Sequence, residues 1–202
     1  MIQESNMTIK ILGVGGSMRN GSYGTRALKM VLYSARKHEA KTHLLDLRGT
    51  IMPMFNPDTP NEHHDQMKRV IENVNWADAF VLASPDYHGS MSGVMKNFLD
   101  FYWEEFAGKT FGYICSSHEK GLTVMEQMRT AVRQCYGWSL PYGVSVNGEE
   151  DFNEEGEIIN QILDKRLKIL GRDLVVYGTL IREQFLRDVS SDVSDTFAAR
   201  YR

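Results

Sequence analysis

The chain has 202 residues, of which 42% are hydrophobic and 24% charged, and its formal net charge is −3. This predicts one globular domain over residues 1–202, with an extension at 1–6 and a polar tail at 187–202. The weak negative charge without a basic run argues against a nucleic-acid partner, and the apolar runs are too short to span a membrane. The first six residues lack the basic and apolar regions of a signal peptide.

The two cysteines, Cys115 and Cys135, lack the CxxC spacing of zinc sites and redox pairs. We therefore expect neither a disulfide framework nor a metal site, and a reducing, cytoplasmic location. Both lie in apolar or helical stretches, which favours packed thiols over nucleophiles. The adjacent His63 and His64 would point to different faces of a helix, so they do not form a metal-ligand pattern.

Apolar strand-like segments alternate with helical patterns along the chain, which predicts an α/β fold with a parallel sheet. The predicted strands cover residues 8–14, 42–47, 77–84, 110–115 and 142–146. The predicted helices cover 25–37, 64–75 (capped by Asn61), 94–103, 123–136 and 157–185, the last interrupted only by Gly171 and Gly178. Prolines predict a long loop over 48–62, and acidic residues predict a solvated loop over 147–153.

Five strands with intervening helices suit a flavodoxin-like fold. This is a three-layer α/β/α sandwich with a five-stranded parallel sheet of order 2-1-3-4-5. In that order a ligand binds beyond the carboxyl ends of strands one and three. The loops after predicted strands one, three and four are rich in Ser, Gly, Arg, Tyr and His. Small polar residues therefore gather where the topology predicts a ligand site.

The first of these loops is a candidate phosphate site. Between Lys10 and Leu28 the chain passes from an apolar strand through glycines, serines and one arginine into a helix. A helix start presents unpaired N–H groups with partial positive charge, and hydroxyls and a guanidinium add donors. Met18 breaks the GxGxxG pattern, and neither a P-loop nor a GxSxG elbow is present. A hydroxyl-rich loop for a monophosphate remains, with an ordinary polar turn as the alternative.

The loop over residues 85–93 is different in kind. It contains Pro85, Tyr87, His88 and Gly89. Backbone N–H groups of such a loop can face the edge of a flat heteroaromatic ring, and Tyr87 can pack beside that ring. The alternative is a simple strand-to-helix turn.

Two motifs resemble those of the NAD(P)H-dependent FMN reductase family. The segment from Gly16 to Ser22 (GSMRNGS) is similar to the family's GSxRxxS phosphate loop. The segment from Ser84 to Asp100 (SPDYHGSMSGVMKNFLD) is similar to its PEYNxSxPGxLKNxxD motif. The resemblance extends to the fifth predicted strand. It implies a flavodoxin-like fold, FMN as cofactor and NAD(P)H as reductant.

Carried over position by position, the resemblance implies the residues that hold FMN. The phosphate is expected at Ser17, Arg19, Ser22, Gly24 and Thr25. The ring is expected against Pro85, Asp86, Tyr87, His88, Gly89 and Ser90, with Ser116, Ser117, His118 and Gly121 at its other edge. Asp86, His88 and Ser92 stand where the family usually has Glu, Asn and Pro. The third loop, residues 116–121, lacks the family's common glycine pair. These departures lie beside the ring, where an acceptor would stack.

The resemblance implies an FMN-dependent NAD(P)H oxidoreductase. Hydride would pass from NAD(P)H to N5 of FMN and then to a small-molecule electron acceptor, such as free flavin or a quinone. No side chain is a certain catalytic residue, but His88 or His118 could supply a proton to a quinone. Alternatives on the same fold are a flavodoxin-like FMN electron carrier without its own NAD(P)H turnover, and a flavin-free binding protein. The net charge of −3 is weak for a carrier's acidic docking surface.

The resemblance also implies a homodimer or homotetramer in which a partner subunit helps to wall the flavin site. An aromatic cluster fits either a subunit interface or a core; its members are Phe98, Phe101, Tyr102, Trp103 and Phe106.

Overall fold

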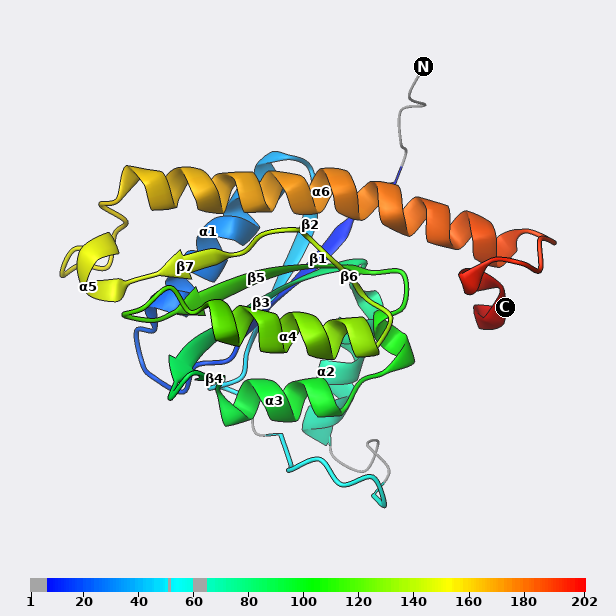
Figure 1. Cartoon of the computed structure of the whole chain (residues 1–202), viewed down its shortest axis with the longest axis horizontal. Coiled ribbons are helices and arrows are strands. Elements are labelled where there is room, and N and C mark those ends of the chain that lie inside the picture. The colour runs from blue at the N-terminus through cyan, green and yellow to red at the C-terminus, as the bar shows by residue number, and fades with distance from the viewer. Residues whose placement is uncertain (1–6, 51, 60–64) are drawn as a thin grey trace.

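A largely parallel sheet runs through the middle of the fold, with helices on both faces (Figure 1). The structure, a computed structural model, describes residues 7–50, 52–59 and 65–202. The strands are β1 (Lys10–Gly15), β2 (Lys41–Asp46), β3 (Ala79–Tyr87), β4 (Ser90–Met91), β5 (Thr110–Ser116), β6 (Trp138–Ser139) and β7 (Val144–Val146). Their order is β2-β1-β3-β5, and both β6 and β7 pair with the far side of β5. The predicted flavodoxin-like order is confirmed, with the fifth position divided between two short strands.

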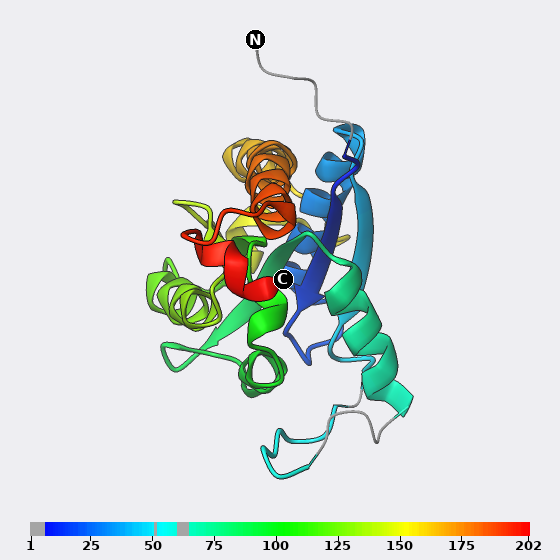
Figure 2. The same ribbon diagram turned by 90° about the vertical axis from the view of Figure 1, so that its right-hand side faces the viewer.

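Helices form the two outer layers of the sandwich (Figures 1 and 2). The helices are α1 (Tyr23–Lys37), α2 (Asp65–Trp76), α3 (Gly93–Asp100), α4 (Leu122–Gln134), α5 (Gly148–Asp151) and α6 (Gln161–Ser190), with 3-10 turns η2 (Glu104–Phe106) and η3 (Phe197–Tyr201). Successive residues of β3 face opposite layers, as the pleat of a strand requires. Phe80 and Leu82 join the core beneath α2, α3 and α4. Ala79, Val81 and Ala83 join the core beneath α1 and α6.

The aromatic cluster after α3 belongs mainly to the core. Phe98, Phe101, Tyr102 and Phe106 are at most 7% exposed, whereas Trp103 is 63% exposed. The rings of Phe80 and Phe111 stack with centroids 4.6 Å apart and meet Phe106 edge-on. Of the two readings left open by the sequence, the core is therefore correct for four of the five aromatic residues.

The segment predicted as a loop at 85–93 contains a hairpin, so the sheet is not wholly parallel. β3 continues to Tyr87, and β4 pairs antiparallel with it. His88 and Gly89 form the two-residue turn, with φ of +57° and +76°. Positive φ at both positions is typical of tight hairpin turns whose twist matches the strands. The prediction was wrong here because Pro85 and Asp86 are usually turn residues, but the turn lies after them.

The long helix α6 is continuous through both of its glycines. An added Cβ at Gly171 would lie 2.6 Å from the Val31 carbonyl oxygen of α1, and one at Gly178 would lie 2.6 Å from Ile9 Cδ1. The glycines therefore allow close packing rather than interrupting the helix. The helix begins at 161 and not at 157 because the Asn160 side chain accepts hydrogen bonds from the first free N–H groups. It continues to 190, and η3 folds back beside its end (Figure 2).

Several other boundaries differ from the prediction. The helix predicted over 94–103 ends at Asp100, and the loop predicted over 147–153 contains the short helix α5. Residues 52–59 of the long predicted loop are tied to α3 through Asn97, whose amide accepts from Phe55 N–H and donates to the Pro53 carbonyl, both at 2.8 Å. Residues 1–6, Asn61, His63 and His64 lie outside the described residues.

Candidate functional site

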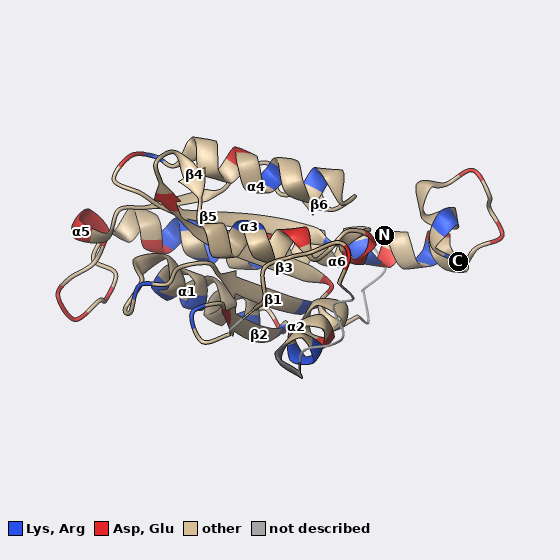
Figure 3. Cartoon of the chain, turned by 90° about the horizontal axis from the view of Figure 1, so that it is seen from below, with Lys and Arg blue, Asp and Glu red and all other residues tan. Residues whose placement is uncertain are grey.

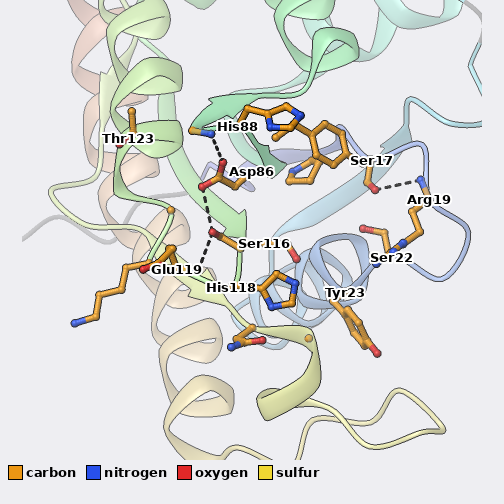
Figure 4. A pocket seen from close by; sticks show the side chains of 18 of the residues that line it. Ser17, Arg19, Ser22, Tyr23, Asp86, His88, Ser116, His118, Glu119 and Thr123 are labelled. Atoms are coloured by element: carbon orange, nitrogen blue, oxygen red, sulfur yellow. Dashed lines mark hydrogen bonds between the residues drawn. The ribbon is translucent and has the colours of Figure 1, made fainter.

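A cleft of about 960 Å³ lies at the carboxyl ends of β1, β3 and β5 (Figure 4). Arg19 and Ser22 lie on one side of it, and Glu119 and Thr123 on the other. Its size is at the upper end of the roughly 300–1,000 Å³ typical of small-molecule sites. Acidic residues of α5 and of the following loop lie at the neighbouring end of the molecule (Figure 3).

Most predicted site residues line this cleft. They are Ser17, Arg19, Ser22, Pro85, Asp86, Tyr87, His88, Gly89, Ser116, Ser117, His118 and Gly121. Three predicted residues do not line it. Gly24 and Thr25 lie in the first turn of α1, and the Ser90 hydroxyl donates to Gln127 of α4 over 3.0 Å, beside a separate groove.

The cleft also contains residues that sequence reasoning missed: Tyr23, Glu119, Lys120, Leu122, Thr123, Asn147, Gly148 and Glu149. The interpretation of 147–153 as a solvated loop was therefore incomplete. Asn147 directly follows β7, at the same carboxyl edge of the sheet as the other loops. The topology rule that selected three loops could have selected this one too. The acidic composition of residues 147–153 instead suggested a solvated loop.

The first loop presents free hydroxyl protons at a helix start. The Ser22 Oγ accepts the Thr25 N–H over 3.3 Å and so caps α1, while the Ser17 Oγ accepts the Arg19 N–H over 3.2 Å. Because both hydroxyls accept, their protons stay available to a ligand. The first turn of α1 carries no acidic residue. This set of donors suits an anion such as phosphate.

Ser92 connects the first loop to the hairpin. Its hydroxyl donates to the Gly16 carbonyl over 2.6 Å and accepts the Met95 N–H over 3.2 Å, so it also caps α3. Its own N–H donates to the Ser84 hydroxyl over 3.0 Å. On its other side, Gly16 donates its N–H to the Ala83 carbonyl over 2.7 Å. The base of the first loop is therefore held from two directions.

Asp86 connects the hairpin to the third loop. One carboxylate oxygen accepts the Gly89 N–H over 2.8 Å, and the other accepts the Ser117 hydroxyl over 3.1 Å. From the opposite side, the Gln127 amide accepts the Met91 N–H over 3.0 Å and donates to the Gly89 carbonyl over 3.3 Å. The hairpin thus has a defined position despite its exposed turn.

Cys115 and Gly121 pack against each other at the base of the third loop. Gly121 has a φ of +59°, and an added Cβ there would lie 2.3 Å from Cys115 Sγ. Burial, and then the Asp86 charge, raise the pKa of the Cys115 thiol to about 12. Burial also raises the pKa of Cys135. Both thiols are therefore protonated packing groups, as expected from the sequence.

No cluster of three or more His, Cys, Asp or Glu side chains suited to a metal ion occurs among the described residues. Within the same part of the chain, none of the helices is both long and apolar enough to cross a bilayer.

The fold and the cleft together define a flavodoxin-like α/β protein with a nucleotide-sized site at the switch in strand order. Residues 9–151 match the sequence model of the NADPH-dependent FMN reductase family, and the chain belongs to this family. It is therefore an NAD(P)H-dependent oxidoreductase that works with FMN.

Individual relatives agree with this membership. An NAD(P)H-dependent FMN reductase from Pseudomonas aeruginosa is 35% identical over 94 residues, a match that spans 46% of this chain and 49% of that protein. An FMN-dependent NADPH-azoreductase from Staphylococcus aureus is 29% identical over 158 residues, 73% of this chain and 82% of that protein. The structure of the NAD(P)H:(acceptor) oxidoreductase FerB from Paracoccus denitrificans shares the fold, with a TM-score of 0.70, 18% identity and coverage of 84% and 97%.

The residues present in the cleft fit FMN, which is a phosphate joined by a polyol chain to a flat ring. The hydroxyls of Ser17 and Ser22 and the N-terminus of α1 suit the phosphate. The hairpin and the third loop line the rest of the cleft, whose volume can accommodate a flat ring.

Proposed function

We propose that this chain transfers electrons from NAD(P)H, by way of FMN held in the cleft, to a small-molecule acceptor such as free flavin or a quinone. The observation that supports this best is the meeting of three loops at one cleft: the hydroxyl-rich loop, the braced hairpin and the third loop. Each follows a parallel strand at the edge where this topology places ligands. Family membership supports the same reaction class.

In this proposal the first loop binds the FMN phosphate. Ser17, Arg19 and Ser22 supply side-chain donors. The first turn of α1 adds the Gly24 N–H, and the Thr25 N–H holds the Ser22 hydroxyl in place. An added Cβ at Gly24 would lie 3.5 Å from Ser116 Cβ, so the start of α1 lies against the third loop, which supports a shared site.

The flavin ring would lie between the hairpin residues 85–90 and the third loop, residues 116–121. When bound, FMN supplies the group that accepts a hydride from NAD(P)H. The chain's own part is to orient the ring between two loops that Asp86 ties together. His88 and His118 both line the cleft and are exposed, so either can hold a proton for a quinone acceptor.

We further propose a homodimer or homotetramer in the cytoplasm. A groove of about 620 Å³ between α3 and α4 borders the cleft, and Thr123 lines both. A second copy seated there would reach the open side of the site. Two free thiols are in keeping with a reducing compartment. Light scattering of the purified protein tests the oligomeric state, and a monomer would contradict this part.

The function is tested by titrating the purified protein with FMN and then adding NADPH without oxygen. We expect loss of the visible flavin absorbance, followed by steady NADPH oxidation when free flavin or a small quinone is supplied. An electron carrier would bind FMN but show no NADPH turnover of its own. A protein that binds no FMN would contradict the proposal altogether.

The phosphate site is tested with Arg19→Ala. A hydrogen bond to a charged group contributes about 1.5–3 kcal/mol, and the exposure of Arg19 favours the low end, so the FMN dissociation constant should rise roughly tenfold. Riboflavin lacks the phosphate, so its binding should not change. Arg133→Ala, an exposed arginine of α4 outside the cleft, is the matched control. An equal loss of affinity for FMN and for riboflavin would contradict the role of Arg19 in binding the phosphate.

A further inference from the structure

Asn147 has a buried carboxamide oxygen without a hydrogen-bond partner, although the residue lines the cleft. It stands at the N-cap position of α5, where an asparagine side chain normally accepts a backbone N–H. Here it accepts none. Buried polar atoms are nearly always satisfied, so this oxygen calls for an explanation.

The backbone around Asn147 is held without help from its side chain. The Asn147 N–H donates to Asp151 Oδ2 over 2.7 Å, and its carbonyl accepts the Asp151 N–H over 2.9 Å. The other oxygen of the buried Asp151 accepts from the Asn160 amide over 2.7 Å. The Asp151 carboxylate therefore caps this segment, and the Asn147 carboxamide oxygen accepts no hydrogen bond from the described residues.

Asn147 lies between the third loop and the start of α1. The Ser117 N–H donates to the carbonyl of Val146, the residue just before it, over 2.9 Å. The residue after it, Gly148, packs against the Tyr23 ring so closely that an added Cβ would lie 2.0 Å from a ring carbon. Tyr23 directly follows the capping Ser22 of the proposed phosphate site. Asn147 is thus next to the phosphate end of the cleft, between the third loop and the start of α1.

We propose that the Asn147 carboxamide hydrogen-bonds to a sugar-type hydroxyl of the bound nucleotide, in a subsite formed with Ser116 and Tyr23. This rests on the proposed function. With the phosphate at α1 and the ring at the hairpin, the polyol chain of FMN spans the stretch between them. A hydroxyl can both donate to Oδ1 and accept from Nδ2, so it satisfies either end of the carboxamide. The ribose of NAD(P)H carries the same chemistry and is the second possible source.

The test is Asn147→Ala, measured by binding of three flavins to the apoprotein. FMN and riboflavin carry the polyol chain, and lumiflavin does not. One neutral hydrogen bond corresponds to roughly a fivefold to tenfold rise in dissociation constant. We expect that rise for FMN and riboflavin and no change for lumiflavin. The unfolding midpoint of the apoprotein should stay level or rise, because an unsatisfied buried oxygen is removed. Glu150→Ala, an exposed residue of α5 outside the cleft, is the control.

The outcomes are distinct. Unchanged flavin binding with a raised KM for NADPH supports the hydroxyl subsite and assigns it to the ribose of the reductant. An equal loss of affinity for lumiflavin, or no change in any flavin dissociation constant or in the KM for NADPH, overturns the proposal. If the unaltered protein binds no FMN, the proposed function itself fails. If it binds FMN and Asn147→Ala binds FMN and NADPH equally well, only the subsite fails.

Discussion

Ser92→Ala removes a hydroxyl that serves two buried partners at once. The side chain is 3% exposed, donates to the Gly16 carbonyl and accepts the Met95 N–H. Loss of a serine cap costs about 1 kcal/mol. Leaving the Gly16 carbonyl buried and unpaired costs about 1–3 kcal/mol more. Since all these groups are buried, no discount for solvent applies, and we expect a loss of about 2–4 kcal/mol in the free energy of unfolding.

The assay is urea unfolding, supported by the thermal midpoint. For a chain of about 200 residues, that loss corresponds to a midpoint lowered by roughly 5–15 °C. The FMN dissociation constant should also rise, because Gly16 leads into the first loop. Ser145→Ala, a half-buried serine of β7, is the matched control and should change stability by less than about 0.5 kcal/mol.

Ser92→Pro sharpens this test, because proline is the residue that the family usually has at this position. Ser92 has a φ of −60°, which proline adopts without strain. The substitution nevertheless removes both the hydroxyl and the N–H that donates to Ser84. We expect a loss at least as large as that of Ser92→Ala. If the free energies of unfolding of both variants lie within about 0.5 kcal/mol of that of the original chain, the hydrogen bond from Ser92 to Gly16 does not stabilise the fold and the reasoning is refuted.

Three further predictions concern packing, charge and the hairpin. Gly171→Ala should lower the free energy of unfolding in urea by about 1–3 kcal/mol, since the new Cβ would lie 2.6 Å from the Val31 carbonyl oxygen. Gly93→Ala is the control, because its Cβ would meet open space and should not destabilise the fold. Burial lowers the pKa of Lys109 from 10.5 to about 8, so the unfolded chain holds that proton more tightly and stability should rise between pH 8 and 10.5. Lys109→Met should remove up to about 3 kcal/mol of that rise. If the free energy of unfolding depends on pH in the same way in this variant, Lys109 is not the group responsible. His88→Asn should preserve or raise stability, because asparagine accepts a φ of +57° well. If His88 donates a proton to quinones, the pH profile of quinone reduction should change in this variant; an identical profile would end that hypothesis.

Much of the architecture could be predicted because the pattern behind it is local. Apolar runs such as 8–14 and 110–115 lie close to β1 and β5, and their alternation with helices leads to the observed strand order. The loops after β1, β3 and β5 were selected by the same rule, and their residues do line one cleft. Strand and helix formation depend on burial periodicity, which a sequence displays directly, and the alternation of the two selects the doubly wound topology.

The missed features depend on contacts between distant segments. Ser92 and the Gly16 carbonyl are 76 residues apart, and nothing local to Ser92 predicts that bond. The hairpin turn at His88 was hidden by earlier turn-forming residues, and its pairing required the strand to continue. Gly171 looks like a helix breaker until the Val31 carbonyl is placed beside it.

The sequence by itself therefore determined the class of fold, the strand order and most of the loops that meet at the cleft. Only the tertiary structure decided that the aromatic cluster belongs mainly to the core, that α6 continues through its glycines, and that Asn147 lines the cleft with an unpaired oxygen. The physical reason is that periodic burial is written into neighbouring residues. The partners of a buried polar atom, by contrast, exist only once distant segments have packed together.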